Sequence, residues 1–520
     1  MNVGKLLSKA AATYPEKPAL IHGPKRLTYA QFDARVNRLA GGLGRLGLVK
    51  GDNVAILQYN YPETLESLFA CFKAGFGSVP INFRLHPKEF AYIIDHSEAK
   101  AVIVSPEFNE SIVEIRDRLP KVRHFITILG ANEYLMDYEK LIAMGSDRFD
   151  EVDTDPDDLA WLFYTSGTTG DPKGAMLTHR VLLRMTMNFY ADILPLSPFD
   201  AILHAAPLSH GSGLYSLPNI GKGATNVIPE NKSFDVELTF EAIERYRITN
   251  MWAAPTMIKL LVEGDACTRY DHSSLKGLIY GGGPMYAEDL KRALQKLGPC
   301  LVQLYGQGES PMTITYLPPW DHVPEGTPEQ GTRLSSAGIQ RTDVEVKIFG
   351  PEDTELPAGE VGEIVTRSDL VMKGYWRNRE ATAETLRNGW LHTGDVGYMD
   401  PKGYLFILDR SKDMIVSGGE NIYPREIEEV LIRHPAVREA AVIGVPDDRW
   451  GESIKAVVAL APGANATEND LIAFCKDNIA SYKKPKSVDF VDALPKNNYG
   501  KIVKRDLRAR YWAGRDRKII

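Results

Sequence analysis

The chain has 520 residues, of which 44% are hydrophobic and 25% charged, and its formal net charge is −7. This length exceeds one ordinary core, so two or three domains are expected, and the net negative charge gives no electrostatic basis for binding nucleic acid. Its cysteines form neither a metal-binding nor a disulfide pattern: Cys71, Cys267, Cys300 and Cys475. No apolar signal segment opens the chain, and no apolar run reaches the ~20 residues of a membrane span. We therefore predict a cytoplasmic protein.

The first 330 residues alternate between short apolar runs and helical patterns. Thr28 is typical of a helix N-cap, and apolar residues then recur at helical spacing at Phe32, Val36, Leu39, Leu43 and Leu46. The apolar runs predict strands at Asn53–Leu57, Val102–Ser105, His124–Leu129, Leu159–Tyr164, Ala201–Ala206, Leu275–Tyr280 and Leu301–Leu304. Because buried strands that alternate with helices pair mainly in parallel, this order predicts an α/β fold of stacked layers.

From about Ser336 the pattern changes to short strands separated by Gly, Pro and Asp turns. Strands are expected at Val344–Phe349, Gly362–Arg367 and Tyr404–Leu408, which together predict a small antiparallel β module. An α+β unit follows, with helices at Pro424–Arg433 and Glu468–Asn478 and strands at Glu439–Val445 and Ala456–Leu460. The polar stretch at Asp409–Lys412 is the expected domain boundary.

The stretch Tyr164-Thr-Ser-Gly-Thr-Thr-Gly-Asp-Pro-Lys-Gly174 is the strongest functional signal. Glycine lets the backbone approach a ligand closely, and exposed N–H groups with hydroxyls and a lysine form an anion-binding concavity. A flexible linker would rarely follow a strand directly. The P-loop pattern does not fit, because Pro172 stands five residues after Gly167. The sequence therefore predicts a phosphate-binding loop of another kind.

Seven further short motifs follow in order: Pro207-Leu-Ser-His210, Tyr280-Gly-Gly-Gly-Pro284, Tyr305-Gly-Gln-Gly-Glu309, Trp390-Leu-His-Thr-Gly-Asp395, Asp409-Arg410-Ser-Lys412, Val416-Ser-Gly418-Gly419 and Pro495-Lys-Asn-Asn-Tyr-Gly-Lys501. With the loop, they resemble the adenylate-forming superfamily of acyl-coenzyme A synthetases, luciferases and peptide-synthetase adenylation domains. The resemblance covers Tyr164 to Lys501, and the N-terminal part is similar more loosely.

The resemblance implies a role for each motif in the binding of ATP and the acid. The ATP phosphates would be bound by Thr165, Ser166, Gly167, Thr168, Thr169, Gly170 and Lys173. The nucleotide would further contact Gly281, Gly282, Gly283, Pro284, Tyr305 and Gly306. Asp395 and Arg410 would hold the ribose, and His210 would line the entrance for the carboxylate. Glu309 would bind Mg²⁺, since this ion favours one or two carboxylates together with substrate phosphates.

The resemblance also implies a moving C-terminal domain. It divides the chain into residues 1–409, a hinge over 410–412 centred on Lys412, and a mobile domain over 413–520. Lys501 would bridge the acid and the α-phosphate during adenylation, whereas Lys496 and Lys504 are expected to be solvated. After rotation, Gly418 and Gly419 would line the pantetheine channel. The context of Lys501 resembles an acetylation site, so a lysine acetyltransferase and a deacylase are expected partners, and a homodimer is compatible with the sequence.

These roles imply an AMP-forming acyl-coenzyme A ligase that uses ATP, Mg²⁺ and coenzyme A. A carboxylate is a poor electrophile, and attack on the α-phosphorus of ATP converts it to an acyl-adenylate with release of pyrophosphate. The developing charge requires preorganised cations and N–H donors. Attack by the coenzyme A thiolate then gives acyl-CoA and AMP.

Three alternatives remain. An amino-acid-activating domain that loads a carrier protein would need an aspartate just after His210, and Gly211–Tyr215 contains none. A luciferase-like oxygenase acting on the adenylate is close in sequence. A nucleotide-binding relative without activity is disfavoured because nearly every motif residue is present. One departure is Gly308, where most relatives carry threonine: Gly308→Thr should preserve or improve ATP turnover, unless a bulky acyl group uses that space.

The acid is expected to be a monocarboxylate with an uncharged tail, either fatty or aryl. The segments expected to form its pocket are Gly211–Leu217, Met251–Lys259, Tyr280–Pro284 and Gln303–Ser310. Apart from Lys259 and the assigned Glu309 they carry no charge, and no arginine is available for a second carboxylate.

Overall fold

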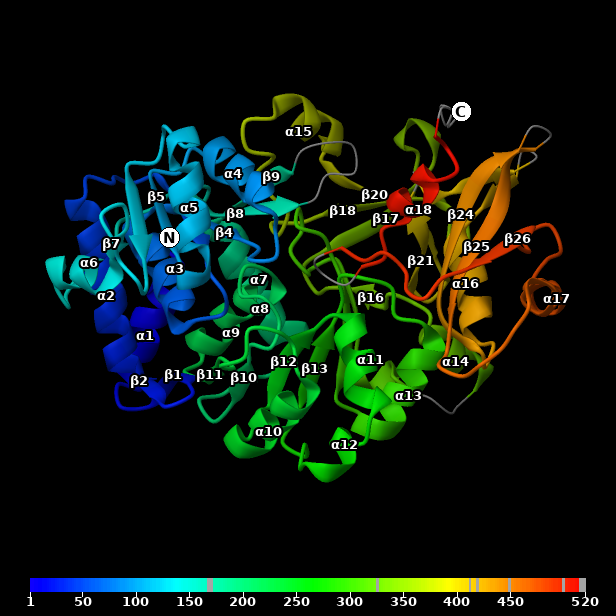
Figure 1. The fold of residues 1–520 in the computed structure, drawn as a ribbon, viewed down its shortest axis with the longest axis horizontal. Coiled ribbons are helices and arrows are strands. Elements are labelled where there is room, and N and C mark those ends of the chain that lie inside the picture. The colour runs from blue at the N-terminus through cyan, green and yellow to red at the C-terminus, as the bar shows by residue number, and fades with distance from the viewer. Residues whose placement is uncertain are drawn as a thin grey trace.

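The computed structural model describes residues 1–165, 172–323, 327–410, 413–417, 420–447, 450–497 and 501–513. Four β-sheets organise these residues, and the last of them lies with its helices on the right in Figure 1. Before residue 250, the helices of seven or more residues are α1 (Lys5–Thr13), α2 (Tyr29–Arg45), α3 (Pro62–Ala74), α4 (Pro87–His96), α5 (Asn109–Ile115), α6 (Tyr138–Met144), α7 (His179–Asp192) and α10 (Val236–Tyr246). The remaining helices are α8 (Gly211–Leu214), α9 (Ser216–Gly221), α11 (Pro255–Glu263), α12 (Ala266–Arg269), α13 (Ala287–Leu297), α14 (Pro328–Arg333), α15 (Arg379–Thr385), α16 (Pro424–Ile432), α17 (Glu468–Asn478) and α18 (Lys504–Ala509).

The first sheet has seven strands in the order β7-β6-β5-β3-β4-β8-β9. Their bounds are β3 Asn53–Leu57, β4 Gly77–Ile81, β5 Ala101–Val104, β6 His124–Thr127, β7 Met136–Asp137, β8 Leu159–Thr165 and β9 Lys173–Thr178. All neighbours pair in parallel except β8 and β9, which form an antiparallel hairpin. The phosphate-loop motif therefore connects two strands of a hairpin, whereas a P-loop leads into a helix.

The second sheet has nine strands in the order β16-β15-β14-β13-β12-β10-β11-β1-β2. Their bounds are β1 Pro18–His22, β2 Lys25–Thr28, β10 Ala201–Leu203, β11 Thr225–Val227, β12 Asn250–Ala253, β13 Gly277–Tyr280, β14 Leu301–Tyr305, β15 Thr315–Leu317 and β16 Ile339–Gln340. Its central strands are parallel, so their carboxyl ends lie at one edge, where ligands of open α/β sheets bind.

The third and fourth sheets have five strands each. The third consists of β17 Glu345–Phe349, β18 Gly362–Arg367, β19 Leu386–Arg387, β20 Trp390–Met399 and β21 Leu405–Arg410, all antiparallel. The fourth consists of β22 Ile415–Ser417, β23 Glu420–Ile422, β24 Val437–Asp447, β25 Gly451–Leu460 and β26 Ser487–Phe490. The predicted β module and the following α+β unit are both confirmed as separate sheets.

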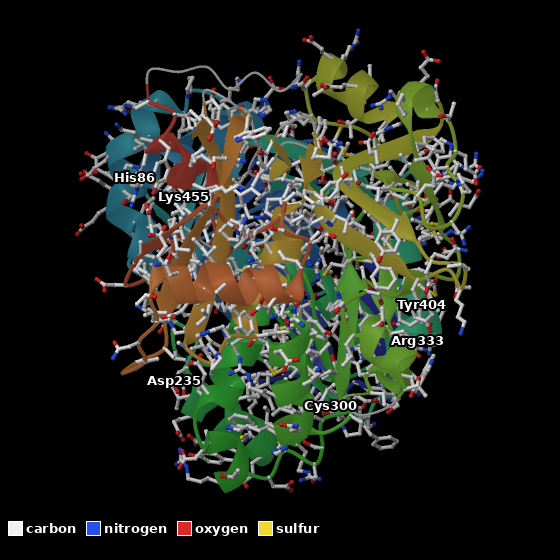
Figure 2. The ribbon with its side chains drawn as sticks, turned by 90° about the vertical axis from the view of Figure 1, so that its right-hand side faces the viewer. His86, Asp235, Cys300, Arg333, Tyr404 and Lys455 are labelled. Carbon is white, nitrogen blue, oxygen red and sulfur yellow. The ribbon has the colours of Figure 1, made fainter. Side chains whose placement is uncertain are left out.

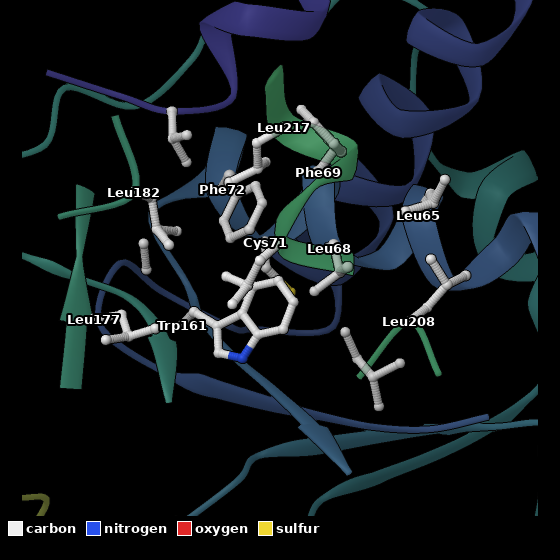
Figure 3. Packing of buried hydrophobic residues seen from close by; sticks show 14 of the residues in the cluster. Leu65, Leu68, Phe69, Cys71, Phe72, Trp161, Leu177, Leu182, Leu208 and Leu217 are labelled. Carbon is white, nitrogen blue, oxygen red and sulfur yellow. The ribbon is translucent and has the colours of Figure 1, made fainter. Parts of the chain in front are cut away.

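Trp161 of β8 anchors the core beneath the phosphate loop. Its fully buried indole stacks on Phe72 of α3 at a centroid distance of 6.5 Å. Figure 3 shows Trp161 surrounded by side chains from several elements, including Leu177 of β9 and Leu182 of α7. Because these neighbours come from two helices and from the adjacent strand β9, β8 is fixed by close packing up to the point where the phosphate-loop motif begins.

The helices and strands that the local signals predicted are present in the structure. Thr28 caps α2 through a capping box with Gln31, and Phe32, Val36, Leu39 and Leu43 are buried. The predicted strands agree with the structure to within a few residues. The long strand β20 was not predicted, and it places Asp395 within the third sheet. Among the described residues no helix is long and apolar enough to cross a membrane.

Candidate active site

A cavity of about 250 Å³ lies between the second and third sheets and the C-terminal unit. Gly282, Gly283 and Pro284 line it after β13, and Tyr305, Gly306 and Gln307 line it after β14. The C-terminal unit contributes Lys501 and Lys504. Residues that the sequence analysis assigned to one site therefore meet in one cavity. Two of them, Gly282 and Lys501, are 219 positions apart in the chain.

Asp395 is the centre of a hydrogen-bonded cluster in this cavity. The Tyr305 hydroxyl donates to Asp395 Oδ2 at 2.7 Å, and the Gln307 amide donates to the same oxygen at 2.9 Å. Arg410 Nε lies 3.2 Å from Asp395 Oδ1, because the two residues are cross-strand partners on β20 and β21. Burial and the nearby Asp395 raise the pKa of Tyr305 well above its usual value, so its hydroxyl stays a donor. Gln307 was missed by sequence reasoning, although it lies inside a recognised motif.

The Gly281–Gly283 loop combines a packing role with a lining role. A Cβ on Gly281 would lie 2.5 Å from the Leu304 carbonyl oxygen, so this glycine allows β13 and β14 to approach. Gly282 has a φ of +81°, a conformation that favours glycine. Gly282 and Gly283 line the cavity, whereas Gly281 faces Leu304.

Glu309 lies beside both ends of the phosphate loop. Thr165 and Lys173 are cross-strand partners at the end of the β8–β9 hairpin. Thr165 Oγ1 is 3.5 Å from Glu309 Oε1, and the Tyr375 hydroxyl donates to the same oxygen at 2.6 Å. Lys173 Nζ lies 5.3 Å from the centre of the Tyr375 ring. The loop residues Ser166, Gly167, Thr168, Thr169 and Gly170 lie outside the described residues.

The carboxylate of Glu309 is suited to bind Mg²⁺. The second carboxylate oxygen, Oε2, accepts no hydrogen bond from any described residue, so it is available to a cation. The described residues contain no group of three or more His, Cys, Asp or Glu side chains able to hold a metal. An ion at Glu309 would therefore depend on nucleotide phosphates for most of its ligands, as Mg²⁺ usually does.

His210 lies directly before the short helix α8 and beside β8. Its Nδ1 is hydrogen-bonded to Ser209 Oγ at 2.9 Å, and its ring packs edge-on against Phe163 at 5.1 Å. Burial, together with the positive charge of Arg84, lowers the pKa of His210 to about 3. The imidazole is therefore neutral at physiological pH and suited to hydrogen bonding rather than to charge pairing.

Gly308 is required by its neighbours. A Cβ at this position would lie 2.4 Å from Thr165 Cγ2 and 2.9 Å from Phe163 Cδ1. Both contacts are to short or ring side chains that are themselves packed, so neither can move away easily. The space that a threonine would occupy is filled, and the expectation that Gly308→Thr simply restores a phosphate contact does not fit this geometry.

Gly308→Thr should instead raise the KM for ATP by about 10-fold, because overpacking of ~1–3 kcal/mol would displace Thr165 at the start of the phosphate loop. Steady-state kinetics with varied ATP will measure the change. Gly44→Ala is the matched control, since a Cβ there meets nothing within 4 Å. Wild-type KM in Gly308→Thr would contradict the assigned packing role.

Lys501 reaches the same cavity as Asp395 and Arg410. Its backbone N–H donates to Asn497 Oδ1 at 2.9 Å, and its carbonyl accepts from the Asn497 N–H at 2.8 Å. Burial, reinforced by the positive Arg410, lowers the pKa of the Lys501 ammonium. No carboxylate of a described residue lies within 4.0 Å of Lys501 Nζ, so the charge remains available to a ligand. Lys412, Gly418 and Gly419 lie outside the described residues.

The expectation that Lys504 is solvated is wrong. Its ammonium lies 2.9 Å from both Asp409 Oδ2 and Glu428 Oε1, and only 14% of its side chain is exposed. Burial alone would lower the pKa of Lys504, but the two carboxylates outweigh it and raise the pKa. The Tyr286 hydroxyl donates to Glu428 Oε2 at 3.2 Å and joins the second sheet's side of the cavity to α16. Lys496 is also paired, with Glu439.

Comparison with known proteins gives consistent matches over the whole chain. The family model for AMP-binding enzymes matches residues 7–376, and the model for the C-terminal domain of AMP-binding enzymes matches residues 426–501. Feruloyl-CoA synthases from Amycolatopsis sp and Streptomyces sp are 40% identical over 97% of this chain and 98% of theirs. The fatty acid–[acyl-carrier-protein] ligase ScoC from Streptomyces coeruleorubidus is 36% identical over 97% of this chain and 95% of its own. The structure of the anthranilate CoA ligase AuaEII with anthranoyl-AMP has a TM-score of 0.91 at 28% identity, covering 98% of this chain and 97% of that one.

Proposed function

This chain belongs to the AMP-binding enzyme family, and on that basis we propose a role for each side chain of its active site. It is an AMP-forming acyl-coenzyme A synthetase, which activates a carboxylic acid with ATP and transfers the acyl group to coenzyme A. The observation that carries the assignment of residues is the meeting of Lys501 with the Asp395–Arg410 pair in one cavity.

In our proposal, the cavity binds ATP for adenylation. Asp395 and Arg410 hold the ribose hydroxyls, and Gly282, Gly283 and Pro284 face the adenine. Thr165, Lys173 and the loop between them bind the phosphates. Lys501 supplies a positive charge between the acid and the α-phosphate, where negative charge develops in the transition state.

Glu309 would hold Mg²⁺ through its free oxygen. The bound ion would neutralise phosphate charge. Neutral His210, beside Phe163, orients the incoming carboxylate by hydrogen bonding. The contacts of Glu309 with Tyr375, and of His210 with Ser209 and Phe163, support these roles, because they fix both side chains before the substrate arrives.

The second half-reaction requires a change of conformation. We propose domains over residues 1–409 and 413–520 that rotate about a hinge at 410–412, with Lys412 at its centre. Rotation would carry Lys501 out of the cavity and bring Gly418 and Gly419 to the pantetheine channel. The position of Lys501 in the lining of the cavity supports this proposal, because the residue assigned to adenylation is supplied by the C-terminal unit.

The acid is, in our proposal, an aryl monocarboxylate. A Cβ on Gly211, next to His210, would lie 2.8 Å from Trp252 Cε2 and 3.1 Å from Met312 Sδ. The side chains of Trp252 and Met312 therefore lie close to the residue that we assign to the carboxylate. With Phe163 they form mostly aromatic walls. The similarity to feruloyl-CoA synthases and to an anthranilate CoA ligase supports an aryl acid. A fatty acid is the second candidate, supported by the similarity to ScoC and to fatty-acid CoA ligases.

An aryl monocarboxylate such as 4-methoxybenzoate should exceed terephthalate in kcat/KM by at least about 100-fold, since burying an unpaired second carboxylate costs several kcal/mol. Lys259, which is the one cation of the predicted pocket segments, is paired with Asp289. Arg84, whose positive charge acts on His210, lies outside those segments. A pyrophosphate-release screen over matched mono- and dicarboxylates, with hexanoate and adipate as the aliphatic pair, will measure the ratio. A dicarboxylate with the highest kcat/KM would refute the proposed pocket.

The same screen, run with coenzyme A and with a carrier protein, identifies the acyl acceptor, since ScoC acts on a carrier protein by name. A cytoplasmic location is proposed from the four cysteines, which are all buried and free. A homodimer and acetylation of Lys501 remain predictions.

A further inference from the structure

Tyr375 stands between the two charged side chains that flank the phosphate loop. Its hydroxyl donates to Glu309 Oε1 at 2.6 Å, and Lys173 Nζ lies 5.3 Å from the centre of its ring. The side chain is 8% exposed, so both contacts are largely removed from water. Tyr375 is therefore in contact with the anionic and the cationic group at once.

The backbone around Tyr375 is fixed to the loop on both sides. Tyr375 lies beside β9 and forms an isolated antiparallel bridge with Ala175. The Met176 N–H donates to the Gly374 carbonyl at 2.9 Å, and the Trp376 N–H donates to the Gly174 carbonyl at 2.7 Å. At the other end, the Met372 N–H donates to the Glu309 carbonyl at 2.7 Å. Tyr375 thus has a defined position relative to β9 and to Glu309.

Lys173 and Glu309 carry opposite charges close to one site. Two such groups tend to form an ion pair, and an ion pair here would neutralise the charges that phosphate and cation need. No carboxylate of a described residue lies within 4.0 Å of Lys173 Nζ. Tyr375 satisfies the two groups separately, because its hydroxyl is a donor and the face of its ring attracts a cation.

We propose that Tyr375 is a positioning residue that keeps Lys173 and Glu309 apart and aligned for the metal–nucleotide complex. Its hydroxyl occupies Glu309 Oε1 and leaves Oε2 for the divalent ion. Its ring holds the Lys173 ammonium beside the phosphate loop. The inference rests on the proposed roles of Glu309 and Lys173 in binding the metal and the phosphates.

The test separates the hydroxyl from the ring. Tyr375→Phe keeps the ring but removes the hydrogen bond, and it should weaken Mn²⁺ binding in the presence of ATP about 10-fold, the scale of a hydrogen bond to a charged group. Electron paramagnetic resonance of Mn²⁺ measures this directly. ATP binding without a divalent ion, measured by calorimetry, should remain unchanged in Tyr375→Phe. Tyr375→Leu removes both contacts and should weaken ATP binding in either condition.

Tyr404→Phe is the matched control. The Tyr404 hydroxyl donates to Asp321 Oδ2 at 2.8 Å, and the Arg333 guanidinium lies 4.8 Å from the centre of its ring. Figure 2 shows Tyr404 beside Arg333. The same kind of contacts thus occurs outside the proposed site, and Tyr404→Phe should leave Mn²⁺ and ATP binding unchanged.

Glu309→Gln tests the metal-binding role of Glu309 separately from the positioning role of Tyr375. If Glu309→Gln leaves Mn²⁺ binding unchanged, the proposed role of Glu309 fails. If Glu309→Gln weakens it but Tyr375→Phe does not, only the positioning role is overturned. Thioester formation from supplied acyl-adenylate reports whether each variant is folded. Should Tyr375→Phe fail to fold, Tyr375→His is the second variant, because it retains an aromatic ring and an N–H donor. Mn²⁺ binding by Tyr375→His supports the positioning role of Tyr375. A folded Tyr375→His variant that does not bind Mn²⁺ overturns that role.

Discussion

Replacing Lys501 with alanine should slow acyl-adenylate formation by about 10²–10³-fold, the usual effect of removing one preorganised charge donor at a transition state. Lys501 lies in the cavity with Asp395 and Arg410, and no carboxylate of a described residue neutralises it there. Thioester formation from adenylate supplied ready-made should persist near the wild-type rate, because in our proposal Lys501 has then left the cavity.

The two half-reactions need separate assays, with pyrophosphate release for the first and AMP release from added adenylate for the second. Lys501→Arg, which retains the charge, should recover part of the first rate. Lys476→Ala removes an exposed lysine of α17 and should change neither. An equal loss of both half-reactions in Lys501→Ala would refute the assignment to adenylation.

Acetylation of Lys501 should have the same effect as the alanine variant, because it removes the charge. The modified protein should lose adenylation, keep thioester formation and regain adenylation after treatment with a deacylase. Normal adenylation by protein shown by mass spectrometry to be fully acetylated at Lys501 would contradict the proposed charge role.

Replacing Lys504 with alanine should lower the free energy of unfolding by about 3–5 kcal/mol, the range for removing one partner of a buried ion pair. Asp409 and Glu428 would then face each other without a cation, and both are largely buried. Asp409 lies on β21 of the third sheet and Glu428 lies on α16 of the C-terminal unit, so the loss falls on the contact between this sheet and that unit. Adenylation should slow as well, because this contact holds the part that carries Lys501.

Lys483→Ala is the matched control for Lys504. Lys483 pairs at 2.7 Å with Glu426, which lies on α16 as Glu428 does. This pair is more exposed and should contribute only ~0–1 kcal/mol. Urea unfolding of both variants gives the comparison. In addition, Lys504→Ala combined with Glu428→Gln and Asp409→Asn should regain stability, since no unpaired charge then remains. Similar losses in Lys504→Ala and Lys483→Ala would show that the buried cluster has no special role.

The sequence by itself determined the local elements and the composition of the site. Thr28 and the apolar spacing after it were sufficient for α2, and the motifs at Asp395, Arg410 and Lys501 identified groups that the fold brings into one cavity. These features can be predicted from the sequence because capping and helical spacing act over a few residues, and because the motifs keep their residue types at fixed positions.

Only the tertiary structure decided which neighbours act on these groups. Tyr375 contacts Glu309 from 66 positions away, Lys504 is buried by Asp409 and Glu428 rather than solvated, and Gly308 is required by Thr165 and Phe163. Each of these contacts depends on strand pairing and on burial between distant elements. A lysine in solvent and a lysine between two buried carboxylates have the same local sequence signal, because the free energy that separates them comes from desolvation and from partners supplied by other parts of the chain.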